Sequence, residues 1–318
     1  MTVPARRAPP PRPSARRDLP PEHLILGRAS SENFPVATRL LPASMRKDLL
    51  ALYGWARLVD QLGDDYPGDR LAALDEVEGQ LEAALANGPD AATTAYELHP
   101  LVTAIAGTVR RLGLPAGPLF DLVKANRQDQ LVSRYPTFGD LVGYCELSAN
   151  PVGRMVLAIF GVSTPQRLSW SDSICTALQL TEHWQDVAED ALVGRVYLPM
   201  EDLARFGVDV GDLLPPSTGF VDRSRRGAQG GGSPQLRALL AFEAARARRM
   251  LDEGSLLIAS LKGRLRFAVA GFVAGGHAAL DALAAADFDP FADRARPTRR
   301  ARLGPHLARL LLNAGWPL

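Results

Sequence analysis

Apolar residues recur at every third or fourth position through most of the chain, which is the spacing of one face of an α-helix. Pro67-Gly68 and Gly113-Leu114-Pro115 are examples of the breakers between such blocks. Pro151 predicts a kink or break inside one block. Because no alternating strand pattern is found, the sequence predicts a single all-α domain with a central cavity or bundle core. The periodic blocks span residues 43–63, 69–87, 94–112, 116–132, 137–161, 166–193, 235–260 and 264–286.

The two ends of the chain differ in composition from the blocks between them. Residues 1–21 hold seven prolines and almost no large apolar side chain, so we expect a disordered Pro/Arg-rich tail there. Residues 294–318 carry six arginines and no acid, and predict a basic C-terminal tail. The domain between them, residues 22–293, contains a proline- and glycine-rich stretch at 207–234 that predicts an exposed loop.

The formal net charge of +1 conceals an uneven distribution. Residues 1–20 and 294–318 contribute +4 and +6, which leaves −9 for the body. A body this acidic argues against nucleic-acid binding, which needs clustered Lys and Arg, and suits a metal ion. The basic tails could contact anionic lipid headgroups, although solvated ends are the favoured interpretation. No apolar stretch reaches the length of a bilayer span and no secretory signal is present, so a cytoplasmic protein is predicted, at most peripheral at the membrane.

A narrow polar stripe runs down the block 43–63. Tyr53, Arg57, Asp60 and Asp64 are spaced four, three and four residues apart, which places them within about 60° of one another on a helix. Leucines occupy the other directions. A surface helix usually has a broad polar face, so a thin polar line among leucines is a candidate site.

A second stripe lies in the block 166–193. Gln179, Glu182, Asp186 and Asp190 are spaced three, four and four residues apart, again within about 80°. Carboxylates stacked in this way repel one another by a few tenths of a kcal/mol per pair, and a cation removes that penalty. Mg²⁺ takes one or two carboxylates together with waters and substrate phosphate oxygens.

One acidic stripe alone is usually a solvated face, as the pair Glu78/Glu82 illustrates. Two similar stripes, with Arg57 and Arg195 nearby, favour a Mg²⁺–diphosphate site. The glycine-rich runs do not follow a strand, so no dinucleotide fingerprint is present.

Further motifs surround the two stripes. Ser31 to Ala37 (SENFPVA) precedes the first, and Gly194 to Pro199 (GRVYLP) follows the second. With the stripes themselves, they resemble the squalene/phytoene synthase family from about residue 28 to about residue 290. Glu32 to Ala37 and Ser148 to Arg154 (SANPVGR) resemble in particular its bacterial hydroxysqualene synthase subgroup.

The resemblance implies the isoprenoid-synthase helical bundle, with aspartate-rich helices facing each other across a central hydrophobic cavity. It implies that presqualene diphosphate and water become hydroxysqualene and diphosphate, in bacterial squalene and hopanoid biosynthesis. The pathway partners would be a presqualene diphosphate synthase and a flavin-dependent reductase. Mg²⁺ is the implied cofactor, and no NADPH is expected because water quenches the cation.

The resemblance also assigns roles by position. The implied metal ligands are Asp60, Asp64, Glu182, Asp186 and Asp190. The implied catalytic residues are Tyr53 and Arg57 near the diphosphate and Tyr144 in the cavity. The implied substrate contacts are Ser31, Gln179 and Arg195.

Two positions depart from the family pattern. Gln61 stands where the family's Asp-Asp-x-x-Asp motif has its second aspartate, and Glu182 stands where a metal-binding asparagine is usual. Two alternatives therefore remain. One is a head-to-head prenyl transferase that makes presqualene diphosphate, squalene or phytoene from prenyl diphosphates such as farnesyl diphosphate. The other is a catalytically silent paralogue that binds prenyl diphosphates.

Overall fold

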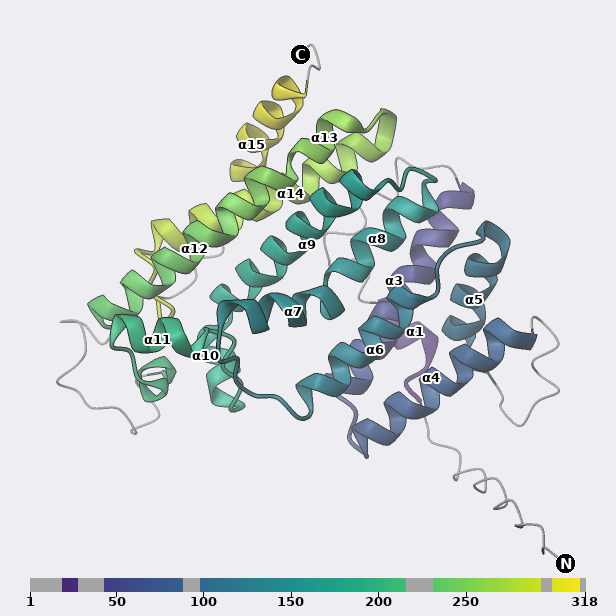
Figure 1. Cartoon of the computed structure of the whole chain (residues 1–318), viewed down its shortest axis with the longest axis horizontal. Coiled ribbons are helices and arrows are strands. Elements are labelled where there is room, and N and C mark those ends of the chain that lie inside the picture. Colours follow the sequence, from purple (N-terminus) through teal and green to yellow (C-terminus); the bar gives the residue numbers. More distant parts are fainter. Residues whose placement is uncertain (1–18, 28–42, 88–97, 216–230, 293–298, 315–318) are drawn as a thin grey trace, which may run out of the picture.

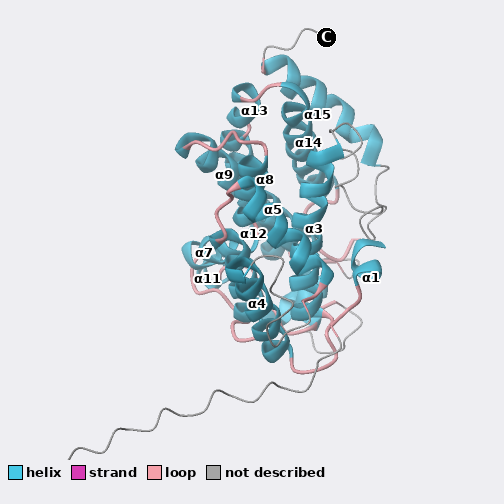
Figure 2. Ribbon diagram, turned by 90° about the vertical axis from the view of Figure 1, so that its right-hand side faces the viewer, coloured by secondary structure: helices cyan, strands magenta, loops and turns pink. Residues whose placement is uncertain are grey.

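The structure, a computed structural model, describes residues 19–27, 43–87, 98–215, 231–292 and 299–314. Within these ranges the chain forms helices joined by loops, and the pairing of Arg134 with Val196 is an isolated bridge. Figure 2 accordingly shows helices and loops throughout the described part. The predicted all-α fold is confirmed.

The N-terminal helices enclose one hydrophobic core. Leu52, Trp55 and Leu58 of the long third helix are fully buried in it. In Figure 1 these helices lie at the opposite side of the molecule from the C-terminal helices. Their bounds are α1 Glu22–Gly27, α3 Ala43–Asp64, α4 Arg70–Asn87, α5 Pro100–Leu112 and α6 Gly117–Asp129.

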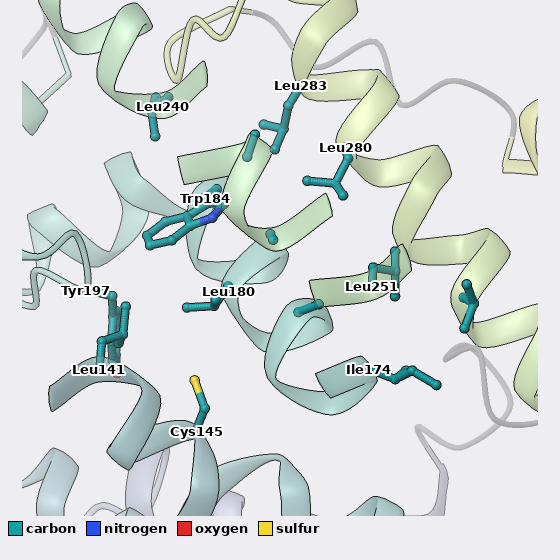
Figure 3. Packing of buried hydrophobic residues seen from close by; sticks show 14 of the residues in the cluster. Leu141, Cys145, Ile174, Leu180, Trp184, Tyr197, Leu240, Leu251, Leu280 and Leu283 are labelled. Carbon is teal, nitrogen blue, oxygen red and sulfur yellow. The ribbon is translucent and has the colours of Figure 1, made fainter. Parts of the chain in front are cut away.

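The remaining helices enclose a second core, with α9 at its centre. Figure 3 shows Leu180 and Trp184 of α9 between Leu141 and Cys145 of α7 and Leu240 of α12. Both cysteines, Cys145 and Cys175, are free thiols. The bounds are α7 Phe138–Ser148, α8 Asn150–Ile159, α9 Pro165–Gln185, α10 Val187–Leu192, α11 Met200–Phe206, the 3₁₀ turn η3 Val210–Leu213, α12 Pro234–Gly254, α13 Leu256–Ser260, α14 Gly263–Ala285 and α15 Arg299–Asn313.

Helix α8 joins the two cores, because Leu157 packs into the second while Met155 and Ile159 pack into the first. The break predicted from Pro151 is present: α7 ends at Ser148 and α8 begins at Asn150, with the proline in its first turn. Proline has no N–H to donate to the preceding turn, and its fixed φ suits the start of a helix.

Two regions differ from expectation. The described part of the predicted basic tail is a helix, α15, which packs on α14 and buries Leu311 rather than extending into solvent. Leu307, Leu310 and Leu311 pack against the second core, at the spacing of one helix face. The predicted loop 207–234 also begins inside the second core, where Val208 and Leu213 are buried. Residues 1–18 and 216–230 lie outside the described ranges.

Helix α14 is 23 residues long and, by length and composition alone, apolar enough to cross a membrane. Its apolar window is 39% buried, and it packs against α9, α12 and α15. A core helix of a soluble protein passes the same test, so this is weak support for a membrane span. From the sequence alone, this apolar stretch is expected to be too short for a bilayer span.

Candidate active site

The first stripe lies on one unbroken helix. Its four residues all fall within α3, where Leu49, Leu52, Leu58 and Leu62 are buried in the first core. Tyr53 is buried, and Arg57 Nη1 lies 3.9 Å from Asp60 Oδ2. Burial raises the pKa of Asp60 to about 7, against the opposing effect of Arg57, although 44% of the side chain is exposed. A carboxylate that is both accessible and closely surrounded by protein is expected in a concave site rather than on an outer face.

Helix α6 holds the end of α3 in place. Asn126 donates through Nδ2 to Asp60 Oδ1 at 3.4 Å, and Gln130 donates through Nε2 to the Gly63 carbonyl at 3.0 Å. The two helices approach so closely that a Cβ on Gly63 would overlap the Asn126 amide. Gly63 therefore permits the close contact between α3 and α6 that fixes where Asp60 and Asp64 lie relative to α6.

The second stripe crosses a helix end. Helix α9 stops at Gln185, Asp186 has non-helical backbone angles, and α10 begins at Val187. The helical spacing of the carboxylates is nevertheless kept across this point. Asp186 N donates to the Glu182 carbonyl at 3.0 Å, and Asp190 N donates to the Asp186 carbonyl at 2.8 Å. Burial, followed by repulsion from Asp186, raises the pKa of Asp190 to about 7.

The two stripes face each other. Glu182 of the second is near enough to Asp60 of the first to help raise its pKa by charge repulsion. Arg195, after α10, forms an ion pair with Asp64 at 3.0 Å across 131 positions of sequence. Gly194 precedes it with a φ of 82°, a left-handed conformation that glycine adopts at little cost and that lets the chain turn back after α10.

A carboxylate that the sequence analysis did not select lies beside this ion pair. Asp129, the last residue of α6, accepts hydrogen bonds from the Tyr144 hydroxyl at 2.5 Å and the Tyr197 hydroxyl at 3.1 Å. Burial raises the pKa of Asp129 to about 6, while these bonds and Arg195 lower it. Tyr135 packs against both tyrosine rings, with ring centroids 5.5 and 5.8 Å away.

His183 connects the aromatic group to the second stripe. Its ring stacks on Tyr197 with centroids 3.7 Å apart, and its Nδ1 lies 4.0 Å from Asp190 Oδ2. Burial, with Arg195 nearby, lowers its pKa to about 3, so the ring is neutral at physiological pH. Gln179 Nε2 lies 3.2 Å from His183 Nε2. Donation from the amide would leave the ring proton on Nδ1, toward Asp190.

A sequence profile of the family described as squalene/phytoene synthase matches residues 27–303. The chain belongs to this family. Relatives carry different names. A phytoene synthase from Arthrospira platensis is 31% identical over 88% of this chain and 89% of its own length. A hydroxysqualene synthase from Sinorhizobium fredii is 34% identical over 75% of this chain and 74% of its own.

Among solved structures, the squalene synthase HpnC from Alicyclobacillus acidocaldarius is 37% identical and superimposes with a TM-score of 0.71. The superposition covers 84% of this chain and 93% of that chain. The isoprenoid-synthase fold expected from the resemblance is thereby confirmed. Family members are enzymes that act on prenyl diphosphates, so the carboxylate-lined region described above is the natural candidate for diphosphate binding.

The structure brings most of the predicted residues of this squalene/phytoene synthase family chain together. Both stripes, Arg195 and Tyr144 converge, while Gln179 contacts His183. Ser31 lies outside the described residues. Asp129 was missed because it stands alone in the sequence. One signal was available: a lone acid at the C-terminal end of a helix opposes the helix dipole and calls for an explanation.

The acidic side chains of the two stripes suit Mg²⁺, which prefers oxygen ligands such as carboxylates. Within the described ranges, no three His, Cys, Asp or Glu side chains are grouped closely enough to hold an ion by themselves. Mg²⁺ does not require this, because it usually takes one or two carboxylates and completes its shell with waters and substrate phosphates. Asp60 and Asp64 on one side, with Glu182, Asp186 and Asp190 on the other, fit that role.

Proposed function

We propose that this family member binds a prenyl diphosphate between the two acidic stripes and breaks its carbon–diphosphate bond. The observation that carries the proposal is the approach of the stripes, each from a different core, around the ion pair of Arg195 and Asp64. One stripe alone could be a solvated face. Carboxylates that face each other from two separate cores repel, and a bound cation would offset that repulsion.

The residues would share the work as follows. Mg²⁺ held by the stripe carboxylates would supply positive charge to the leaving diphosphate. Arg57 and Arg195 would orient the diphosphate oxygens, for which guanidinium groups have matching geometry. The buried aromatic side chains of the second core, such as Tyr197, would limit the access of bulk water to the cation.

Within this scheme we propose the conversion of presqualene diphosphate and water to hydroxysqualene and diphosphate. The motif Ser148 to Arg154 supports it, as does the 34% identity to a hydroxysqualene synthase. No NADPH would be consumed, because water rather than hydride would end the reaction.

The second candidate is head-to-head condensation of two prenyl diphosphates. The relative that supports it is the Arthrospira platensis phytoene synthase, which matches more of this chain than the Sinorhizobium fredii hydroxysqualene synthase does. Both reactions begin with diphosphate release, so the same stripes would serve either. They differ in what meets the carbocation.

The test is to supply the purified full chain with Mg²⁺ and presqualene diphosphate, with and without NADPH, and to identify products by mass spectrometry. The proposal expects hydroxysqualene in both conditions. Farnesyl diphosphate alone, and geranylgeranyl diphosphate alone, test the second candidate, which expects presqualene diphosphate or phytoene-type products. Release of diphosphate from none of these substrates would leave the silent paralogue as the explanation.

The matched control separates chemistry from folding. Asp186→Asn removes one stripe charge, whereas Glu82→Gln removes one exposed charge from α4, outside both stripes. We expect the first variant to lose diphosphate release and the second to keep it, with both retaining the wild-type melting temperature.

A further inference from the structure

Each oxygen of the Asp129 carboxylate accepts a hydrogen bond from a tyrosine hydroxyl. Its Oδ2 accepts from Tyr144 and its Oδ1 from Tyr197, and these tyrosines come from α7 and from the segment after α10. Backbone hydrogen bonds from Val196 N to the Ser133 carbonyl, and from Met200 N to the Tyr135 carbonyl, hold that segment beside the end of α6. The arrangement is therefore fixed by main chain as well as by side chains.

This arrangement decides what the hydroxyl groups can do. A tyrosine hydroxyl has one proton to donate, and here both protons point at Asp129. Each phenolic oxygen can then only accept a hydrogen bond from any further partner. Tyr144 is 5% exposed and its ring is held by Tyr135, Tyr197 and His183, so the hydroxyl has little freedom to turn.

A carboxylate at the position of Asp129 lowers the stability of the fold. A negative charge at the C-terminal end of a helix faces the negative end of the helix dipole. Two tyrosine hydroxyls could be satisfied by an uncharged acceptor at lower cost. Local rules are most often broken at functional sites, and this carboxylate lies beside Arg195 and the second stripe.

We propose that Asp129 is a positioning residue that fixes the Tyr144 oxygen as acceptor for the water molecule that attacks the carbocation. The inference rests on the proposed water-consuming reaction. A water that donates one hydrogen to Tyr144 Oη keeps a lone pair free for the cation. Tyr144 is the catalytic residue in this account, since it touches the reacting water.

The step balances in atoms and charge. The water oxygen forms a C–O bond with the carbocation, which thereby loses its positive charge. The proton that the water loses passes to Tyr144 Oη as the Tyr144 proton passes to Asp129 Oδ2 along the existing hydrogen bond. The product is a neutral alcohol and a protonated Asp129, which returns its proton to solvent before the next turnover.

The test uses full-length Asp129→Asn and Tyr144→Phe with Mg²⁺ and presqualene diphosphate in ¹⁸O-labelled water. Asparagine replaces one acceptor oxygen with a donor NH₂ group, so one of the two tyrosines can no longer donate to this side chain. Phenylalanine keeps the ring packing and removes the oxygen. A positioned proton acceptor contributes about 10²–10⁴-fold, so the labelled alcohol formed per diphosphate released should fall at least ~10-fold in both variants.

Asp121→Asn is the matched control, because Asp121 lies on the same helix and pairs with Lys124 away from the site. A structural role for Asp129 would lower the melting temperature and slow diphosphate release but leave the alcohol fraction unchanged. That result in Asp129→Asn, or in Tyr144→Phe if the first variant does not fold, overturns the inference alone. A wild-type protein that forms no labelled alcohol overturns the proposed reaction together with it.

Discussion

The two acidic stripes are alike in sequence and different in construction. The first lies on an unbroken helix, α3, whose end is fixed by close packing of α6 against Gly63. The second crosses a helix end at Asp186 and is held by the neighbouring side chains of His183, Arg195 and Tyr197. Arg195 and Tyr197 in turn contact Asp64 and Asp129, which are distant in the sequence. One half of the site is thus shaped by helix packing and the other by a polar network.

This difference explains how each half should respond to substitution. A closely packed helix contact has no room for extra atoms, so added atoms near the first stripe should displace it and lower activity. A buried polar network is destabilised when one partner is lost, so the second stripe should be sensitive to the removal of charges and hydroxyl groups. Both halves should be equally sensitive to loss of the carboxylates themselves, because both would contact the same ligand.

The largest effect is expected from Asp60→Asn and Asp186→Asn. Loss of one group that stabilises transition-state charge typically lowers kcat by about 10²–10³-fold, and we expect this from either variant. Diphosphate release from presqualene diphosphate measures it, with Glu82→Gln as control. Near-wild-type release from one of the two variants would mean that only one stripe meets the substrate.

The next largest effect is expected from Gly63→Ala, because the new Cβ would collide with the Asn126 amide and push α3 from α6. A displacement of about 1 Å in a site can lower kcat about 10²-fold, and overpacking costs about 1–3 kcal/mol of stability. Steady-state kinetics measures the change in kcat, and chemical denaturation measures the change in the free energy of unfolding.

Gly79→Ala is its matched control. Gly79 lies in α4 with nothing within 4 Å of an added Cβ. Alanine in a helix is about 0.5–1 kcal/mol more favourable than glycine, so this variant should gain stability and keep its activity. If Gly63→Ala behaves in the same way, the helix contact does not set the first stripe.

A smaller effect is expected from Arg195→Gln, which removes the ion pair to Asp64 from the second half. Its partner is 53% exposed, so the pair should contribute at most about 1 kcal/mol to stability. If Arg195 orients the diphosphate, the substitution should affect catalysis more than stability, and we expect kcat/KM to fall about 10-fold. A melting temperature that falls while kcat/KM is unchanged would make Arg195 purely structural.

The sequence predicted the first half of the site better than the second. Helical periodicity places Tyr53, Arg57, Asp60 and Asp64 on one face, and no distant residue is needed to see it. The end of α9 at Asp186 carries no proline or glycine to announce it. Asp129 and Tyr197 are 68 positions apart, and only the fold brings them together.

The same reasoning applies to the fold. Pro151 predicts the break between α7 and α8 from the sequence alone, because proline acts locally on the backbone. The arginine content of residues 294–318 predicts a solvated tail, whereas α15 is a packed helix. Burial of Leu311 against the second core depends on tertiary packing, which composition does not report.

A separate effect, on stability rather than on turnover, is expected from a buried acid in the second core. Glu243 of α12 is fully buried beside Asp202 and Arg246, and burial raises its pKa from 4.5 to about 8. Between these values the folded chain keeps a proton that the unfolded chain releases. The free energy of unfolding should therefore fall as pH rises through this window, by at most about 1.4 kcal/mol per pH unit.

Glu243→Gln cannot release this proton, so its free energy of unfolding should depend less on pH. Chemical denaturation of both proteins at about pH 5 and about pH 8 makes the comparison. Parallel pH dependence of the variant and the wild type would show that Glu243 is already ionised in the folded state.

The central claim is that two stripes from separate cores hold one Mg²⁺–diphosphate group. Calorimetric titration of inorganic diphosphate in the presence of Mg²⁺ into wild type, Asp60→Asn, Asp186→Asn and the double variant tests it most directly. Substitutions that act on one shared ligand are non-additive, so the second should cost at least ~1 kcal/mol less once the first is present. Additive losses would place the stripes at independent sites and contradict the account.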